Sequence, residues 1–223
     1  AVGVGIFLLF ASKGFQANAK GEEDLLIDCD KVNANYGLLR AKIVGATTKN
    51  GFRNLYVPLF NEVIGNEIST LRFYKCYSAI TQKANNEQFS YLNYSNCNFQ
   101  VRTSGNIGGV AQEAIGKCSF MNITFSDSNI SAGNSRNAGY LFGKHSQADA
   151  DNVGVEISDV SIRSEKNNAL NVSRTIDANG ANESDGSNYG LLFGMAGKVR
   201  IKNVNIFDNV NITLTPPTTQ DEE

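Results

Sequence analysis

Few residues in this sequence could perform chemistry, and their types and spacing do not match a catalytic group. His145 is the only histidine, so any catalytic pair or triad that requires an imidazole would have to use it. It follows a turn-like stretch at residues 138–144 and is therefore expected in a surface loop. Acidic residues fall mostly in expected turns and near residue 223 rather than at matching positions of successive repeats. The sequence predicts no catalytic residues, no cofactor and no enzyme activity.

Metal ligands are equally sparse. Residues 149–152, Asp-Ala-Asp-Asn, offer oxygen atoms that could bind calcium, but they lack the spacing and the glycine of an EF-hand loop. A solvated turn is the expected structure there. Because the chain has no Cys-x-x-Cys pair and no histidine cluster, the sequence predicts no metal site.

Four cysteines occur, and the last three are evenly spaced. Cys76, Cys97 and Cys118 follow one another at intervals of 21, and Cys29 precedes them. If one repeat is that long, the three fall in one column, where neighbouring rungs are close enough for a disulfide. The alternative is that every cysteine is a free thiol and acts as a small buried apolar residue. The spacing leaves both alternatives open.

Six Asn-x-Ser/Thr sequons could accept N-linked glycans in a secreted protein. They begin at Asn93, Asn122, Asn129, Asn171, Asn182 and Asn211. Those at Asn122, Asn129 and Asn211 coincide with a recurring strand pattern, which gives them a structural reason to exist. We expect Asn171 and Asn182 to be the best acceptors because they fall in an expected loop, with Asn93 as a further candidate.

The composition excludes several classes of partner. Only 19% of residues are charged and the net charge is −2, so nothing indicates binding to nucleic acid or to an anionic membrane. The chain contains 28 Asn and 21 Gly but only 3 Pro and no Trp. Asn and Gly suit tight turns, and the many β-branched residues between them favour short strands. Long helices are not expected.

The elements that must position these residues recur along the chain. The clearest repeat is Asn-Tyr-Gly-Leu-Leu-Phe-Gly at residues 188–194, with weaker copies at 35–39, 106–110 and 138–143. Alternating steps follow, in which Asn or Asp precedes an apolar residue, as at 122–125, 159–162 and 203–206. Such a repeat predicts an all-β, right-handed parallel β-helix (β-solenoid) of several stacked coils. Its expected core residues are Leu9, Leu39, Leu141, Phe142, Leu192 and Phe193.

Glycine and asparagine have specific expected roles in this repeat. The glycines at positions 37, 139 and 190 should permit a sharp bend at the entry of each coil. The recurrent asparagines could form side-chain ladders between rungs, or they could simply occupy turns. The sequence does not decide between these two roles.

A single β-solenoid domain is expected over residues 1–213. Residues 165–188 lose the alternation and are expected to form an insertion loop, and residues 214–223 read as a Thr/Pro-rich acidic tail or linker. The apolar run at residues 4–11 fits either a first repeat or the core of a signal-like segment spanning residues 1–19. With about half of the roughly 20 apolar residues that a helix needs, it predicts no transmembrane span.

The repeat resembles the GLUG-type repeats of bacterial surface proteins and adhesins. The turns at 106–110, 138–143 and 189–194 carry the likeness, together with the Asn-apolar steps Asn96-Cys97 and Asn203-Val204. The resemblance covers most of the chain loosely, and it departs at Ala41, which replaces the second glycine of one turn. It implies a parallel β-solenoid with an extracellular or cell-surface role and no catalytic residues.

These observations predict a non-enzymatic structural or adhesive protein. A solenoid needs polar caps at its ends, and no evident polar cap is found at either end of the repeats. We therefore expect self-association end to end, or docking to a neighbouring domain, as in a filament or a larger surface assembly. The alternative is a carbohydrate-binding or polysaccharide-degrading β-helix protein, so that glycans are a second class of expected partner.

Overall fold

The computed structural model is all-β. It describes residues 26–30, 36–40, 42–45, 47–65, 67–100, 105–133, 135–146, 154–166, 168–175, 188–207 and 209–215. Within these ranges there is no helix, and every strand pairing is parallel. The prediction of an all-β chain with parallel sheets is confirmed.

The strands form four sheets. The eight-stranded sheet holds β1 (Leu26–Asp28), β4 (Gly51–Arg53), β6 (Glu67–Tyr74), β8 (Gln88–Ser95), β12 (Ser119–Ser126), β16 (Val155–Arg163) and β20 (Val199–Ile206), with β3 (Ile43–Val44) paired to β6. The six-stranded sheet holds β2 (Tyr36–Leu39), β5 (Phe60–Ile64), β7 (Thr81–Asn85), β11 (Ala111–Ile115), β15 (Phe142–Ser146) and β19 (Phe193–Met195). The four-stranded sheet holds β9 (Asn98–Gln100), β13 (Asn129–Ser131), β17 (Leu170–Thr175) and β21 (Val210–Thr215). The three-stranded sheet holds β10 (Asn106–Gly108), β14 (Asn137–Gly139) and β18 (Asn188–Tyr189).

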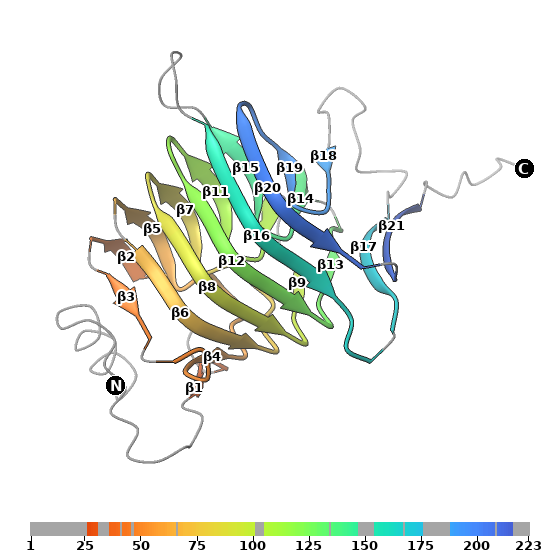
Figure 1. Ribbon diagram of the computed structural model, residues 1–223, viewed down its shortest axis with the longest axis horizontal. Helices are drawn as coiled ribbons and strands as arrows, with labels where there is room; N and C mark the ends of the chain where they lie inside the picture. Colours follow the sequence, from red (N-terminus) through yellow and green to blue (C-terminus); the bar gives the residue numbers. More distant parts are fainter. Residues whose placement is uncertain are drawn as a thin grey trace, which may run out of the picture.

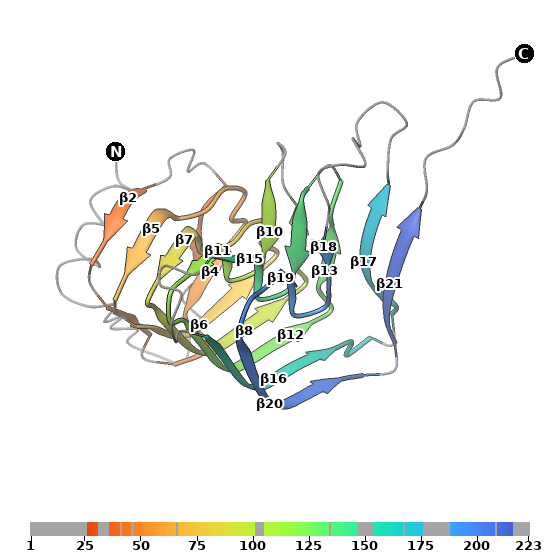
Figure 2. The same cartoon turned by 90° about the horizontal axis from the view of Figure 1, so that it is seen from above.

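The chain visits these sheets in turn, and we call one such circuit a rung. The strands β11, β12, β13 and β14 make one rung, and β15, β16, β17 and β18 lie beside them in the next. Figures 1 and 2 show the eight-stranded sheet forming one side of the molecule, with the other sheets turned away from it. This arrangement is compatible with a β-solenoid.

From β6 onward, successive rungs grow longer. One column of the eight-stranded sheet contains Leu71, Leu92, Ile123, Val160 and Val204 in register. The sequence separations between these register partners are 21, 31, 37 and 44. The increase from 21 to 31 comes from strands β9 and β10, which first appear between the eight-stranded sheet and the six-stranded sheet. The increase from 31 to 37 enters instead between β15 and β16.

The space enclosed by the sheets is filled with aromatic side chains in register. Phe73, Tyr94 and Phe125 stack with ring centroids 4.7 Å apart, and Phe52 extends the stack at 5.8 Å. A second column runs through Phe89 and Phe120, whose centroids are 5.3 Å apart, and reaches Phe142 and Phe193. Phe73, Tyr94 and Phe125 are each at most 1% exposed. These columns are the apolar core that holds the rungs together.

The Asn-apolar steps lie where the backbone enters the left-handed region. Within the eight-stranded sheet, the register skips one residue in each rung, and each skipped residue has a positive φ near 55°. These residues are Thr70, Tyr91, Asn122, Asp159 and Asn203. Asn and Asp tolerate this conformation better than other residues, which accounts for the Asn or Asp that opens three of the predicted steps.

A side-chain ladder of asparagines occurs at a different position, in the turn copies. Asn137 donates to the Oδ1 of Asn106 at 2.7 Å, and Asn188 donates to the Oδ1 of Asn137 at 3.0 Å. The three residues begin the strands of the three-stranded sheet. A side-chain bond between rungs also occurs at the Asn-apolar steps, where Asn203 donates to the Oδ1 of Asp159 at 3.0 Å, so the expected ladders are present at both positions.

The ladder predicts that Asn137→Ala destabilises the protein by about 1–3 kcal/mol, because it leaves the amide oxygen of Asn106 and the amide nitrogen of Asn188 without this partner. Asn137 is 7% exposed, so water replaces the lost bonds only partly. Urea denaturation followed by circular dichroism measures the change. Asn93→Ala on the exposed outer face is the control, and an equal effect of both substitutions would contradict the ladder's contribution.

The expected core residues lie in the following places. Leu39, Leu141 and Phe142 are buried, and Leu192 and Phe193 are partly buried against the same core. Leu9 lies outside the described residues. Leu39 does not share a column with Leu141 and Leu192, because its register partners are Val63, Ala84, Ala114 and His145 in turn. The first copy of the turn lacks the three-stranded sheet, so its Tyr36 enters the six-stranded sheet directly.

The expected insertion loop at residues 165–188 is wrong over part of its length. Strand β17 (Leu170–Thr175) lies inside it and pairs with both β13 and β21. Its apolar residues Leu170 and Val172 alternate and are each 1% exposed. Residues 176–187 and 216–223 lie outside the described residues, and strand β21 extends to Thr215, past the expected domain boundary at residue 213.

Candidate functional site

The strongest candidate for a functional surface is the last described rung, formed by β19, β20 and β21. Each of these strands is the outermost member of its sheet and pairs on one side only. In Figure 1, β20 and β21 are the last strands at the blue end of the stack. Edge strands leave backbone N–H and C=O groups free to pair with another strand.

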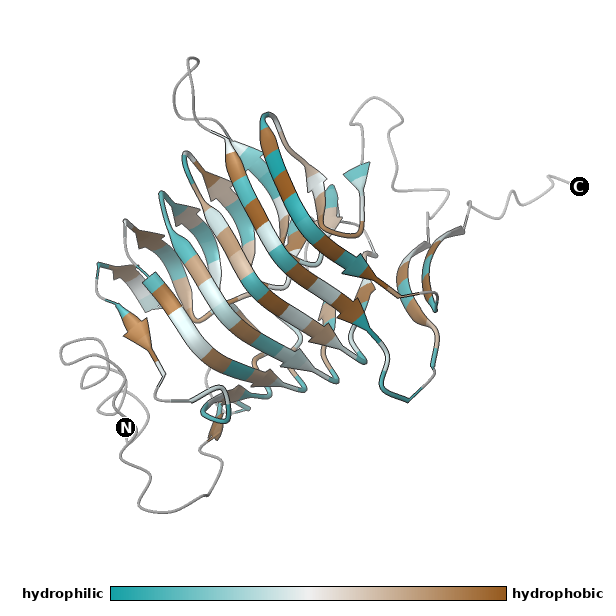
Figure 3. Ribbon diagram, in the orientation of Figure 1, coloured by the Kyte–Doolittle hydropathy of each residue, from teal (hydrophilic) through white to brown (hydrophobic). Residues whose placement is uncertain are grey.

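The apolar columns of the interior emerge at this surface. Ile201 continues the column of Ile157, and its exposure is 49% where that of Ile157 is 1%. Ile206 is likewise 43% exposed, whereas its partner Ile162 is fully buried. The brown stripes that cross the eight-stranded sheet in Figure 3 run on into β20 without interruption. We call the surface formed by residues 193–207 and 209–215 of the last rung the end surface. Its exposed large apolar residues are Met195, Ile201, Ile206, Phe207 and Ile212.

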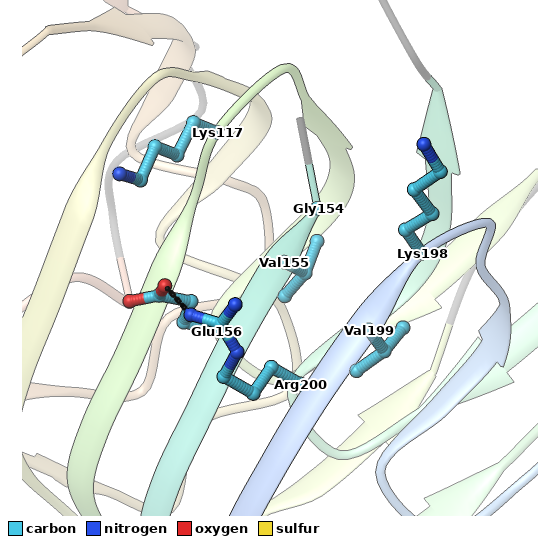
Figure 4. Close-up of a pocket in the computed structure, with 7 residues that line it drawn as sticks. All are labelled: Lys117, Gly154, Val155, Glu156, Lys198, Val199 and Arg200. Atoms are coloured by element: carbon cyan, nitrogen blue, oxygen red, sulfur yellow. Dashed lines mark hydrogen bonds and ion pairs between the residues drawn. The ribbon is translucent and has the colours of Figure 1, made fainter. Parts of the chain in front are cut away.

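A depression of about 430 Å³ lies beside the end surface, at the start of strands β12, β16 and β20. Its lining residues are Lys117, Gly154, Val155, Glu156, Lys198, Val199 and Arg200. Arg200 donates to Glu156 at 2.9 Å, and Lys117 and Lys198 flank this pair (Figure 4). Three cationic side chains and one carboxylate line the depression, so its net charge is positive.

A shallower groove of about 270 Å³ lies on the outer face of the eight-stranded sheet. Arg72, Asn93, Tyr94, Ser95, Thr124, Ser126, Arg163 and Glu165 line it. Arg163 donates to the hydroxyl of Ser126 at 3.3 Å and pairs with Glu165 at 3.0 Å, which fixes the guanidinium over the groove. Hydroxyl, amide and guanidinium groups in a row can hydrogen-bond a polyhydroxylated ligand.

His145 does not lie in a surface loop, contrary to expectation. It sits within strand β15, is 5% exposed, and its Nε2 lies 3.0 Å from the carbonyl oxygen of Gly116. The register of β15 skips Gly143, so Phe142 and His145 both face the interior although they are three positions apart, which the turn-like sequence before them did not reveal. No nucleophilic side chain among the described residues makes a hydrogen bond to it.

The cysteines divide into two places. All four are free and buried, and the amide of Cys76 donates to the sulfur of Cys97 at 3.4 Å from the neighbouring rung. Cys118 is not in their column: it precedes β12, whereas Cys97 follows β8. An eight-residue strand is about 26 Å long, so Cys118 cannot form a disulfide with Cys97. The even spacing misled because the rung from β8 to β12 is longer than the rung from β6 to β8.

Burial should make the thiols unreactive in the folded protein. Burial raises the pKa of the Cys29 thiol to about 12, with the adjacent Asp28 carboxylate adding to the rise, and burial also raises the pKa of Cys76 and Cys118. The pKa of Cys97 is lowered instead, because its burial is outweighed by hydrogen bonds from Cys76 and Ser128, but its 1% exposure still keeps a reagent away from the sulfur. We expect an alkylating reagent to label no cysteine rapidly at mildly alkaline pH, and to label four after denaturation. Fewer than four labelled thiols in the denatured chain, measured by mass spectrometry without reductant, would show a disulfide.

The expected glycosylation sites differ in their settings. Asn93 is exposed on β8, at the groove. Asn171 was expected in a loop, but it lies in strand β17. Its backbone amide donates there to the Oδ1 of Asn129 at 2.7 Å. Asn182 and the Asp-Ala-Asp-Asn stretch at 149–152 lie outside the described residues.

Two further findings concern metals and membranes. Among the described residues, no group of three or more His, Cys, Asp or Glu side chains is arranged to hold a metal ion. Within the same ranges, no helix has the length and apolar character needed to cross a bilayer.

Reasoning from the sequence missed the end surface and the cationic depression. Ile201 and Ile206 look like ordinary core positions, since their alternation matches that of buried strands. Lys117 and Lys198 are far apart in sequence. They line one depression because the rungs between them return the chain to the same end of the eight-stranded sheet. Comparison with protein-family models, with curated proteins and with solved structures finds no match to this chain.

Proposed function

We propose that this chain is a right-handed parallel β-solenoid that acts as a non-enzymatic structural or adhesive element outside the cell, and that it joins another copy or a neighbouring domain through its end surface. The four parallel sheets and their rung-to-rung register support the solenoid. The resemblance to GLUG-type repeats and the polar, weakly charged composition support a role at the cell surface.

The observation that carries the proposal is the exposure of the interior columns at the end surface. Ile201, Ile206 and Ile212 are each between 43% and 50% exposed, although the residues below them in register are buried. Apolar side chains on an unpaired strand edge are stabilised by covering them, at roughly 25 cal/mol for each Å² removed from water. A partner that continues the stack covers both the side chains and the backbone groups.

Sedimentation equilibrium tests the proposal. We expect the chain to self-associate at tens of micromolar and Ile206→Lys to abolish the association, since it places a charge in the contact. Tyr91→Lys is the control, because Tyr91 is 56% exposed on the outer face, away from the end surface. A wild-type protein that remains monomeric at these concentrations would contradict self-association.

Carbohydrate binding is the second candidate function, and the groove on the outer face favours it. Arg72 and Arg163 lie among hydroxyl and amide groups there, an arrangement suited to an acidic saccharide. A glycan array, combined with a lyase and hydrolase assay on acidic polysaccharides, separates the outcomes. Binding without turnover that Arg163→Ala abolishes supports a lectin-like role, turnover supports an enzyme, and no binding leaves the structural role alone.

A further inference from the structure

The two ends of the described stack differ in the sheets that they present. The first four strands, β1 to β4, belong only to the eight-stranded and six-stranded sheets. The four-stranded and three-stranded sheets begin with β9 and β10, at Asn98 and Asn106. The last rung, in contrast, exposes β21 of the four-stranded sheet in addition to β19 and β20.

The two ends also differ in size. Register partners are 44 residues apart in the rung that joins β16 to β20 (Glu156 and Arg200), but only 25 apart in the rung that joins β1 to β4 (Leu26 and Gly51). If a second copy stacked its β1–β4 end on the end surface, its strands could cover β19 and β20. Strand β21 would be left with no partner strand, and Ile212 would stay half exposed. A head-to-tail stack of identical copies therefore leaves part of each apolar end uncovered.

A twofold arrangement does not have this mismatch, because it brings together two surfaces of the same size. In an isologous contact each copy presents the same patch to the other. A twofold axis perpendicular to the stacking direction, passing through the middle of β20, sets the two β20 strands antiparallel. It also exchanges the flanks, so that β19 of each copy faces β21 of the other.

The residues of β20 fit this pairing. With the axis between Lys202 and Asn203, Ile201 faces Val204 of the other copy, and Arg200 faces Asn205. Apolar residues then meet apolar residues, and no two like charges are directly opposite, which would be destabilising. The two Lys202 residues lie diagonally across the axis, and their exposed side chains can extend away from one another into water. Arg200 is in any case paired with Glu156 of its own copy at 2.9 Å.

We propose that two copies of this chain join end surface to end surface in a closed, twofold pair rather than in an open-ended filament. This inference rests on the self-association proposed above and names the partner and its orientation. A closed pair leaves the β1–β4 end of each copy pointing outward.

Light scattering after size exclusion tests the pair with three lysine substitutions. Ile201→Lys on β20 and Ile212→Lys on β21 should each raise the dissociation constant about tenfold or more, because each occurs twice in a twofold contact. Leu38→Lys on β2 is the matched control and should leave the pair intact, since Leu38 and Ile201 are both 49% exposed. Circular dichroism checks that each variant keeps its strands.

A cysteine at the axis gives a second, independent readout. In the proposed pairing, the two residues at position 202 lie diagonally across the axis, within the Cα separation that a disulfide requires. Oxidation of Lys202→Cys should therefore yield a covalent dimer, whereas a head-to-tail contact keeps the two positions a whole molecule apart.

The outcomes are distinct. A dimer that loses affinity with Ile201→Lys and Ile212→Lys, but not with Leu38→Lys, supports the twofold pair. Species that grow beyond two copies with concentration, or dissociation by Leu38→Lys, overturn it while leaving self-association in place. A wild-type monomer overturns both.

Discussion

Phe125→Ala is expected to lower the free energy of unfolding by about 3–5 kcal/mol, the range found when a large buried aromatic is truncated. Phe125 has no exposed surface and stacks on Tyr94 at 4.7 Å. Its ring also meets Phe99 edge-on at 6.0 Å and Tyr140 at 5.1 Å. Substitution removes contacts within its own rung and with the rung below, so neighbouring side chains cannot close the cavity.

Urea denaturation followed by far-ultraviolet circular dichroism measures this loss, and the absence of tryptophan makes tyrosine fluorescence a usable second probe. Tyr91→Ala is the control: Tyr91 is an aromatic residue of the same sheet, but it is 56% exposed. We expect Tyr91→Ala to change the stability by no more than about 0.5 kcal/mol. If both substitutions have similar effects, the aromatic column is not what holds the rungs together.

Gly139→Ala is expected to destabilise the protein by about 3 kcal/mol, at the upper end of the range for overpacking. A Cβ at position 139 would lie 2.3 Å from the Cα of Phe193, 2.5 Å from its nitrogen and 2.7 Å from the carbonyl oxygen of Leu192. All three are backbone atoms of the next rung, which cannot move aside without breaking the ladder. Thermal or urea denaturation should show the loss directly.

Gly37→Ala provides the matched comparison, because Gly37 occupies the corresponding position in another copy of the turn sequence. Nothing lies within 4 Å of a Cβ built at Gly37, so alanine there should be neutral or slightly stabilising. Neither Gly37 nor Gly139 has a positive φ, and the sharp bend expected at these glycines is therefore not the reason for them. Equal destabilisation by both substitutions would contradict the close-approach explanation.

Periodicity made the strands and their parallel arrangement predictable. The turn copies at Asn106, Asn137 and Asn188 occupy one register position, so the sequence similarity reflects true structural equivalence. Alternation was equally informative at residues 159–162 and 203–206, which pair with one another. These features are local sequence patterns, so they remain recognisable although the rungs that contain them differ in length.

The length of each rung could not be predicted, because it depends on how many short strands follow the long one. Cys118 shows the consequence: its even spacing from Cys76 and Cys97 suggested one column, but a longer rung places it at the opposite end of the strand. The copy at Tyr36 was misplaced for the same reason. Leu170 and Val172 were lost in the expected loop because polar residues on both sides hid a short alternation.

The candidate site was less predictable than the fold. A core position and an end position have the same residue types, so Ile201 differs from Ile157 only in what lies above it. The sequence predicted a stack without polar caps that associates through its ends, and this stays a prediction. The sequence could not identify which strands form such an end or how wide it is, since both follow from the growth of the rungs.

The direction of the hydrogen bonds between rungs has a mechanical consequence. The bonds from Tyr140 to Leu191 and from Gly109 to Tyr140 run from one rung to the next, at 2.8 Å and 2.7 Å. A force applied perpendicular to the strands would peel the outermost rung first and break its bonds one after another. A force along the strands would instead shear many bonds together, so the molecule resists tension best when its attachment points pull in that direction.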